Sequence, residues 1–450
     1  MSHEILSLIV LAVVFLVATI RGVNMGALAL VAAFVVGLTV YDVTEADILK
    51  GFPSSLFVIL VGVTYLFALA KNNGTVDWIV HGAVRAVGGR VALVSWAMFV
   101  VCAIVTAIGA VSPAAVAIVA PVAMGFATRY KIHPMLMGMM VVQGATAGSF
   151  SPIGIFGSIT NGVVDKNGLP GNPLFLFVSA FVASLLIAVI AFFAFGGRAL
   201  MARSKETADV TEMGDLAEEG MQSFREGNVR SEPHSKVEAD RTLKADTVPD
   251  HHKLNTQKIM TLVGLVGLIV GALGFGLDVG FTALTVAVVL TLLFPKSAKG
   301  AVEKISWGTV LLIGGIVTYV GLLQNQGVVK WLGDSVADIG APLIAALMIC
   351  LIGAVVSAFA STTGIIGALI PLAVPFLLRG EVNAVALIAA LAIASSVVDC
   401  SPFSTNGALV VANADPSERD SVFRQLMIWG MSIMVIAPVL VWAALVVPTA

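Results

Sequence analysis

Small polar residues and one carboxylate interrupt the longest apolar stretches of this 450-residue chain. Gly, Pro and Ser at high density break a helix and free backbone N–H and C=O groups. Freed carbonyls and hydroxyls suit a hard cation such as Na⁺, whereas helix N-termini attract an anion. Asp399 lies deep in such a stretch, where a carboxylate is a candidate cation ligand or proton carrier. The pattern predicts a site for ions inside a membrane.

The polar residues form two clusters in each half of the chain. They cover residues 109–114 and 148–154 in the first half, and 361–364 and 395–407 in the second. No Lys or Arg falls within them. A plainer interpretation is that small residues only allow close helix packing, and that Asp399 is a protonated structural residue. The matching positions of the clusters favour a binding site.

The composition identifies the kind of protein that must hold these clusters. The chain is 58% hydrophobic and 12% charged, with a mean hydropathy of +1.00. Long uncharged blocks are what a bilayer requires, because an ionised group at its centre is costly. The chain is therefore predicted to be an all-α polytopic membrane protein. Its near-neutral charge balance argues against nucleic-acid binding.

The charge pattern predicts how the chain crosses the membrane. Two long uncharged blocks, 91–128 and 339–378, could each form two crossings or a re-entrant hairpin. With two re-entrant hairpins and about ten transmembrane helices, the cytoplasmic segments hold 21 Lys and Arg residues and the outer segments 4. The positive-inside rule favours this topology. It places both termini outside and residues 198–258 in the cytoplasm, as a largely disordered linker.

The two halves of the chain resemble each other at a nearly constant offset. Asn24-Met25-Gly26 recurs as Asp278-Val279-Gly280, and Ser151-Pro152 recurs as Ser401-Pro402. We therefore expect one transmembrane repeat over 1–197 and a second over 259–450. Five crossings in each repeat would give the two copies opposite orientations, an architecture whose binding site lies where the broken helices meet.

Several of these segments resemble the malonate (MatC-type) dicarboxylate carriers, which are related to the divalent anion–sodium symporters. They are Asn24-Met25-Gly26-Ala27-Leu28, Val63-Thr64-Tyr65-Leu66-Phe67, Ser112-Pro113-Ala114-Ala115-Val116-Ala117-Ile118 and Ser149-Phe150-Ser151-Pro152-Ile153. The resemblance implies two inverted repeats, each with a hairpin and an unwound helix, and a homodimer.

The resemblance also implies which residues bind substrate and cation. In the sodium symporters a Ser-Asn-Thr motif at each hairpin tip does so; Ser361-Thr362-Thr363 nearly matches it, and Val111-Ser112-Pro113 matches it poorly. The candidate substrate-binding residues are Ser112, Pro113, Ser151, Pro152, Ser361, Thr362, Thr363, Ser401, Pro402, Thr405 and Asn406. The candidate residues for Na⁺ or H⁺ coupling are Ser149, Gly154, Ser361, Thr363, Asp399 and Ser404.

The leading functional hypothesis is a secondary transporter that imports a small dicarboxylate, such as malonate, with Na⁺ or H⁺. An exporter or antiporter of the same superfamily, such as an arsenite-type efflux protein, is the alternative. An enzyme is disfavoured, because none of the six His residues lies deep in a span and Asp399 has no intramembrane acidic partner. No cofactor is expected other than Na⁺ as the coupling ion.

Overall fold

The computed structural model describes residues 3–86, 88, 90–202, 254–331, 341–359, 362–378 and 380–449, and within them it contains helices and no strand. The helices are α1 (His3–Arg21), α2 (Met25–Val40), α3 (Glu45–Leu49), α4 (Ser54–Asn72), α5 (Thr75–Ala86), α6 (Val91–Ala107), α7 (Ser112–Tyr130), α8 (Pro134–Ser149), α9 (Ile155–Lys166), α10 (Pro173–Ala194), α11 (Gly197–Ala202), α13 (Thr256–Ile269), α14 (Val279–Leu293), α15 (Pro295–Ala298), α16 (Trp307–Asn325), α18 (Pro342–Phe359), α19 (Thr362–Leu378), α20 (Ala384–Ser396), α21 (Thr405–Asn413) and α22 (Arg419–Val441). Short π or 3₁₀ turns are η1 (Val270–Gly274), η2 (Val397–Cys400), η3 (Trp442–Val446) and η4 (Val447–Thr449).

Apolar helices dominate the fold. Among the residues that the structure describes, six helical segments are long and apolar enough to cross a bilayer, and seven further apolar helices are shorter. Large hydrophobic side chains on the outer faces of α10 and α14 are exposed, for example Leu186 and Leu292. Such faces are stable in contact with lipid rather than water. The predicted all-α polytopic membrane protein is confirmed.

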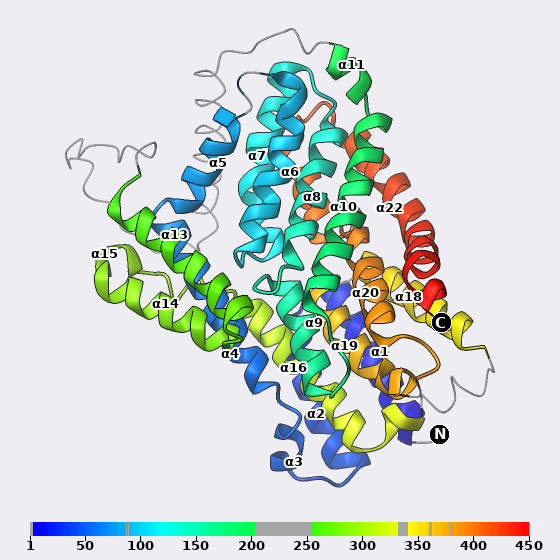
Figure 1. Ribbon diagram of the computed structural model, residues 1–450. Coiled ribbons are helices and arrows are strands. Elements are labelled where there is room, and N and C mark those ends of the chain that lie inside the picture. The colour runs from blue at the N-terminus through cyan, green and yellow to red at the C-terminus, as the bar shows by residue number, and fades with distance from the viewer. Residues whose placement is uncertain are drawn as a thin grey trace.

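Four helices of the two halves cross in two similar pairs, α2 with α16 and α4 with α14. Glycines allow the backbones to touch at both crossings. A Cβ on Gly315 would lie 1.9 Å from the Gly26 carbonyl oxygen, and one on Gly62 would lie 2.6 Å from the Gly280 carbonyl oxygen. Small residues at such contacts are what close helix packing in a membrane requires. Figure 1 shows α4 and α14 side by side, with α13 and α15 extending to one side.

The uncharged block 91–128 folds as a helical hairpin whose arms are α6 and α7, and 339–378 contains the arms α18 and α19. In each hairpin the second arm packs against a helix of the other half. Helix α7 packs against α21, and α19 packs against α9. This exchange of partners is what two copies of one fold would produce. The opposite orientation of the copies and the re-entry of the hairpins stay predictions.

Matching caps begin two helices at the crossings. The Asn24 side chain accepts hydrogen bonds from the N–H groups of Gly26 and Ala27. Asp278 Oδ1 accepts one from the Phe281 N–H at 2.8 Å. Asn and Asp are preferred at this position because they satisfy the free N–H groups of the first turn. Asp278 therefore has a structural role as a helix cap.

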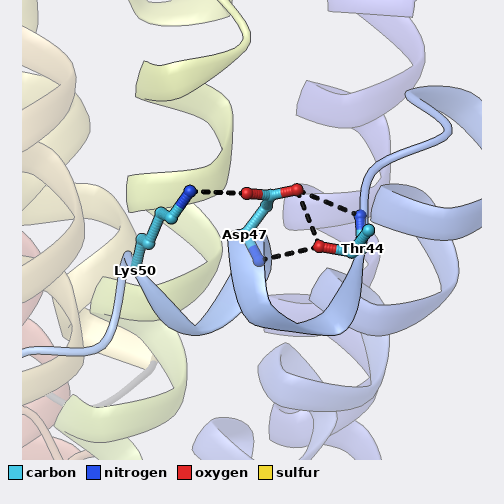
Figure 2. Close-up of polar contacts among 3 residues, drawn as sticks. All are labelled: Thr44, Asp47 and Lys50. Atoms are coloured by element: carbon cyan, nitrogen blue, oxygen red, sulfur yellow. Dashed lines mark hydrogen bonds and ion pairs between the residues drawn. The ribbon is translucent and has the colours of Figure 1, made fainter.

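A short helix, α3, joins α2 to α4 and is held by its own polar residues. Thr44 and Asp47 form a capping box, and Lys50 Nζ lies 2.6 Å from Asp47 Oδ1 (Figure 2). These hydrogen bonds, first from Lys50 and then from Thr44, lower the pKa of Asp47 to about 2. The turn therefore keeps its ionised cap throughout the physiological pH range.

The ends of the predicted linker 198–258 are helical. Residues 198–202 continue α11, and α13 begins at Thr256. The Asn255 side chain caps α13 by accepting the Lys258 N–H at 2.9 Å, a local signal of the kind that starts a helix. The rest of the predicted linker, 203–253, lies outside the described residues.

Candidate functional site

Both predicted helix breaks occur where Ser-Pro interrupts an apolar helix. α8 ends at Ser149 and α9 begins at Ile155; α20 ends at Ser396, η2 follows, and α21 begins at Thr405. Proline cannot continue the helical hydrogen bonding, so the backbone turns at these two points. A Cβ on Gly154 would lie 2.6 Å from the Ser149 carbonyl oxygen, which explains why glycine follows the first Ser-Pro pair.

One hydrogen bond joins the tip of the first hairpin to the broken helix of the second half. Asn406 Nδ2 donates to Ser112 Oγ at 2.8 Å, and both side chains are buried. The residues are 294 positions apart in the chain. Asn406 Oδ1 is also buried, without a hydrogen-bond partner among the described residues. An unpaired buried amide oxygen is costly unless a ligand or water donates to it.

The second hairpin contacts the carboxylate of Asp399 at the second helix break. Thr362 Oγ1 donates to Asp399 Oδ1 at 2.5 Å, and Ser357 Oγ lies 2.7 Å from Thr362 Oγ1. All three side chains are buried, with Asp399 keeping 7% of its surface exposed. Ser404 Oγ donates to the backbone carbonyl oxygen of Asp399. It also caps the N-terminus of α21 by accepting the Gly407 N–H. The carboxylate itself therefore accepts a hydrogen bond from one hydroxyl, that of Thr362, and no Lys, Arg or His lies in α8, α18, α19, α20, η2 or α21.

The equivalent hydroxyls of the first half bond to backbone. Ser149 Oγ donates to the Ala145 carbonyl at 2.7 Å, and Ser151 Oγ donates to the Ala107 carbonyl at 2.7 Å. The second of these bonds joins the first break to the end of α6. Each break is thus linked to the hairpin of its own half, but only the second half does so through a carboxylate.

The predicted site residues differ in how the structure places them. Ser112, Thr362, Asp399, Ser404 and Asn406 take part in the contacts above. Thr363, Ser401 and Pro402 are buried beside them, Pro113 and Pro152 are half-buried, and Thr405 is exposed. Ser361 lies outside the described residues. No hydrogen bond between described residues joins Ser151 at the first helix break to Asp399 at the second. The polar groups therefore form two neighbouring clusters, one at each break, rather than one.

Sequence reasoning missed Ser357. It lies four residues before the Ser361-Thr362-Thr363 cluster, between apolar residues and without an adjacent Gly or Pro, and an isolated membrane serine usually bonds to its own helix. The one feature of the sequence that could indicate its role is its position five residues before Thr362, on the other side of the hairpin tip.

A cleft of about 530 Å³ lies apart from both clusters, between the α7–α8 turn and the α21–α22 turn. Its charged and titratable lining residues are Lys131, His133, Asp415 and Glu418. None of the predicted site residues lines it. His133 Nδ1 accepts the Met135 N–H at 3.2 Å and so caps α8. Burial lowers the pKa of His133, and the nearby Glu418 only partly opposes this.

We predict that this cap makes the stability of the protein depend on pH. Protonation of Nδ1 removes the acceptor. Because the folded pKa lies below the ordinary 6.5, the stabilisation is complete above pH 6.5 and is lost as the pH falls below it. His133→Asn keeps an acceptor that does not titrate, and should make the loss of stability between pH 7.5 and 5.5 smaller than in the wild type. Thermal unfolding of both proteins in detergent measures this. Equal losses in both would contradict it.

Comparison with known proteins gives a match in the first third of the chain. Residues 1–149 match the family model described as the N-terminus of the dicarboxylate carrier protein MatC. The resemblance read from the motifs is confirmed over these residues. None of the curated proteins compared with the chain matches it.

The fold is similar to that of a solved transporter. The crystal structure of the Alcanivorax borkumensis YdaH transporter, described as having an unusual topology, aligns with a TM-score of 0.58 and 16% identity, over 90% of this chain and 88% of that chain. At this identity the likeness concerns the fold alone. The family match and the fold together decide the class of protein. The chain is a transporter. As a transporter rather than an enzyme, it needs no catalytic residues, and the two polar clusters are candidates for binding what it carries.

Proposed function

We propose that the chain is a secondary active transporter that imports a small dicarboxylate, such as malonate, together with Na⁺ or H⁺. The protein would act as a homodimer in the cell membrane, with both termini outside and residues 198–258 in the cytoplasm. The match of residues 1–149 to a dicarboxylate carrier family supports the class of substrate. The excess of Lys and Arg in the segments assigned to the cytoplasm supports the orientation.

The observation that carries the proposal is the hydrogen bond between Asn406 and Ser112, which brings broken backbone from both halves together. Helix α7 begins at Ser112, and α9 begins just after the first break; neither has a side-chain cap. The first-turn N–H groups of α9, the Ser112 N–H of α7 and the positive dipole ends of both helices are therefore available to bind a carboxylate. Such a site binds an anion without Lys or Arg, in keeping with the absence of both from the clusters.

A cation requirement follows from the charge of the substrate. Two negative charges enter a site of low polarity only if their loss of hydration is offset. Asp399, with the Thr362 hydroxyl bonded to it, is the group best placed to bind the compensating cation. We expect the cation to bind first, because an ionised Asp399 beside an unpaired dianion would repel it.

Uptake by the purified protein in proteoliposomes tests the proposal. Labelled malonate is supplied with an inward Na⁺ gradient, with choline instead of Na⁺, and with a pH gradient at constant Na⁺. Accumulation that depends on one of the two gradients is expected. Uptake that responds to neither contradicts coupling, and transport in the outward direction only would favour the exporter. The mass of the protein in detergent tests the homodimer.

Asn406→Ala is predicted to weaken malonate uptake about tenfold in apparent affinity. The change leaves the buried Ser112 hydroxyl without its partner, which costs about 1–3 kcal/mol. Asn413→Ala is the matched control, because Asn413 lies on the same helix and bonds only to the Leu409 carbonyl of its own helix. Uptake is measured at equal amounts of reconstituted protein. Equal effects of the two substitutions would contradict a role for the contact between the halves.

A further inference from the structure

Ser357 is a fully buried hydroxyl that connects the two arms of the second hairpin. It lies near the end of α18, and its Oγ is 2.7 Å from Oγ1 of Thr362, the first residue of α19. Thr362 Oγ1 is in turn 2.5 Å from Asp399 Oδ1. A chain of three side chains therefore runs from one arm, through the other, to the break between α20 and α21.

With Asp399 ionised, the direction of these hydrogen bonds follows from the groups present. An ionised carboxylate only accepts hydrogen bonds, so the single proton of the Thr362 hydroxyl points to Asp399. Ser357 must then be the donor to Thr362. Without Ser357, the Thr362 hydroxyl would lose this donor and could turn towards the Ser395 carbonyl oxygen, which is 3.4 Å away. Ser357 thus donates to the Thr362 oxygen and helps to hold that hydroxyl against Asp399.

The architecture of a hairpin does not by itself require this serine. At the offset of 250 that relates Ser151 to Ser401, the residue equivalent to Ser357 is Ala107, which contributes only its carbonyl oxygen, to Ser151. The first hairpin forms without the hydroxyl. The serine occurs where the second half also has a carboxylate in place of Ser149. The two differences belong together, since hydroxyl donors stabilise the ionised form of a buried carboxylate.

We propose that Ser357 is a positioning residue for Na⁺ coupling, which holds the Thr362 hydroxyl against Asp399 and so keeps that carboxylate oriented to bind Na⁺. The inference rests on the proposed function, because it assigns the coupling cation to Asp399. Ser357 itself does not touch the ion or the substrate. Its loss should therefore weaken the response to Na⁺ and leave the response to saturating malonate nearly unchanged.

The experiment measures malonate uptake while Na⁺ is titrated against choline at constant pH. Ser357→Ala is expected to raise the half-saturating Na⁺ concentration about tenfold, the effect of losing one hydrogen bond to a charged group. The KM for malonate at saturating Na⁺ should change less than twofold. Ser357→Thr keeps the hydroxyl, and its half-saturating Na⁺ concentration should equal that of the wild type. Ser184→Ala is the control, because Ser184 is also fully buried and its hydroxyl has no partner among the described residues.

A double substitution keeps the inference testable if Ser357→Thr packs poorly. Because Ser357 acts through Thr362, adding Ser357→Ala to Thr362→Val should shift the Na⁺ response no further than Thr362→Val alone. Additive shifts, or a Ser357→Ala protein with the wild-type Na⁺ response, would overturn the inference and leave the proposed function intact. Wild-type uptake driven by a pH gradient but indifferent to Na⁺ would do the same. Absence of malonate uptake under every gradient would instead overturn the proposed function.

Discussion

Asp399→Asn is expected to reduce gradient-driven malonate uptake by at least about 100-fold. The substitution keeps the size of the side chain and its ability to accept from Thr362, but removes the one charged side chain of α8, α18, α19, α20, η2 and α21. Truncating one member of a buried charge pair costs about 2–5 kcal/mol, and 2.7 kcal/mol corresponds to a factor of 100. Initial rates of uptake in proteoliposomes with and without the cation gradient measure the effect.

Asp278→Asn is the matched control for this experiment. Asp278 is also surrounded by apolar sequence, but it caps α14, and Asn caps a helix equally well. Asn already occupies the equivalent position in the first half, as Asn24. Asp278→Asn should therefore behave as wild type. If Asp399→Asn also transports with the wild-type rate and cation dependence, Asp399 is a structural residue and the coupling site lies elsewhere.

Gly315→Ala is expected to prevent folding or to lower stability by several kcal/mol. The new methyl group would lie 1.9 Å from the Gly26 carbonyl oxygen, and that neighbour is backbone in the middle of a helix crossing, so neither helix can yield without separating. Overpacking that side chains can absorb already costs about 1–3 kcal/mol. The yield of monodisperse protein in detergent and its thermal unfolding midpoint measure the loss.

A second glycine of α16 provides the comparison. The nearest atom to a Cβ on Gly308 would be the Asn24 Nδ2, 4.0 Å away. Gly308→Ala should be neutral or slightly stabilising, because alanine loses less conformational entropy in a helix. Similar yields and unfolding midpoints for Gly308→Ala and Gly315→Ala would show that the α2–α16 contact is looser than the structure indicates.

The sequence was sufficient to predict the local features of this transporter. Ser-Pro at 151–152 and 401–402 predicted both helix breaks, because proline has the same effect on the backbone in any context. The membrane class followed from the near absence of charge, which the bilayer imposes on every span. These features depend on neighbouring residues and need no knowledge of the tertiary fold.

The contacts that form the site could not be predicted in this way. Asn406 and Ser112 were both candidates, but nothing in the sequence placed them within hydrogen-bonding distance of each other. That contact depends on α7 packing against α21, a long-range arrangement. The role of Ser357 also depends on the angle between two arms. The exposure of Thr405, next to the buried Asn406, shows that a polar residue at a break need not point into the site.

The uncompensated carboxylate at Asp399 has an electrical consequence. If it stays ionised, the empty binding region carries one negative charge, because no Lys, Arg or His lies within the helices α8, α18, α19, α20 and α21 or in η2. A membrane potential that is negative inside would drive such an empty carrier outwards, by up to about 2.3 kcal/mol per 100 mV. Resting voltage would then speed the return of the unloaded protein to the outer face, and depolarisation would slow turnover even with both gradients unchanged.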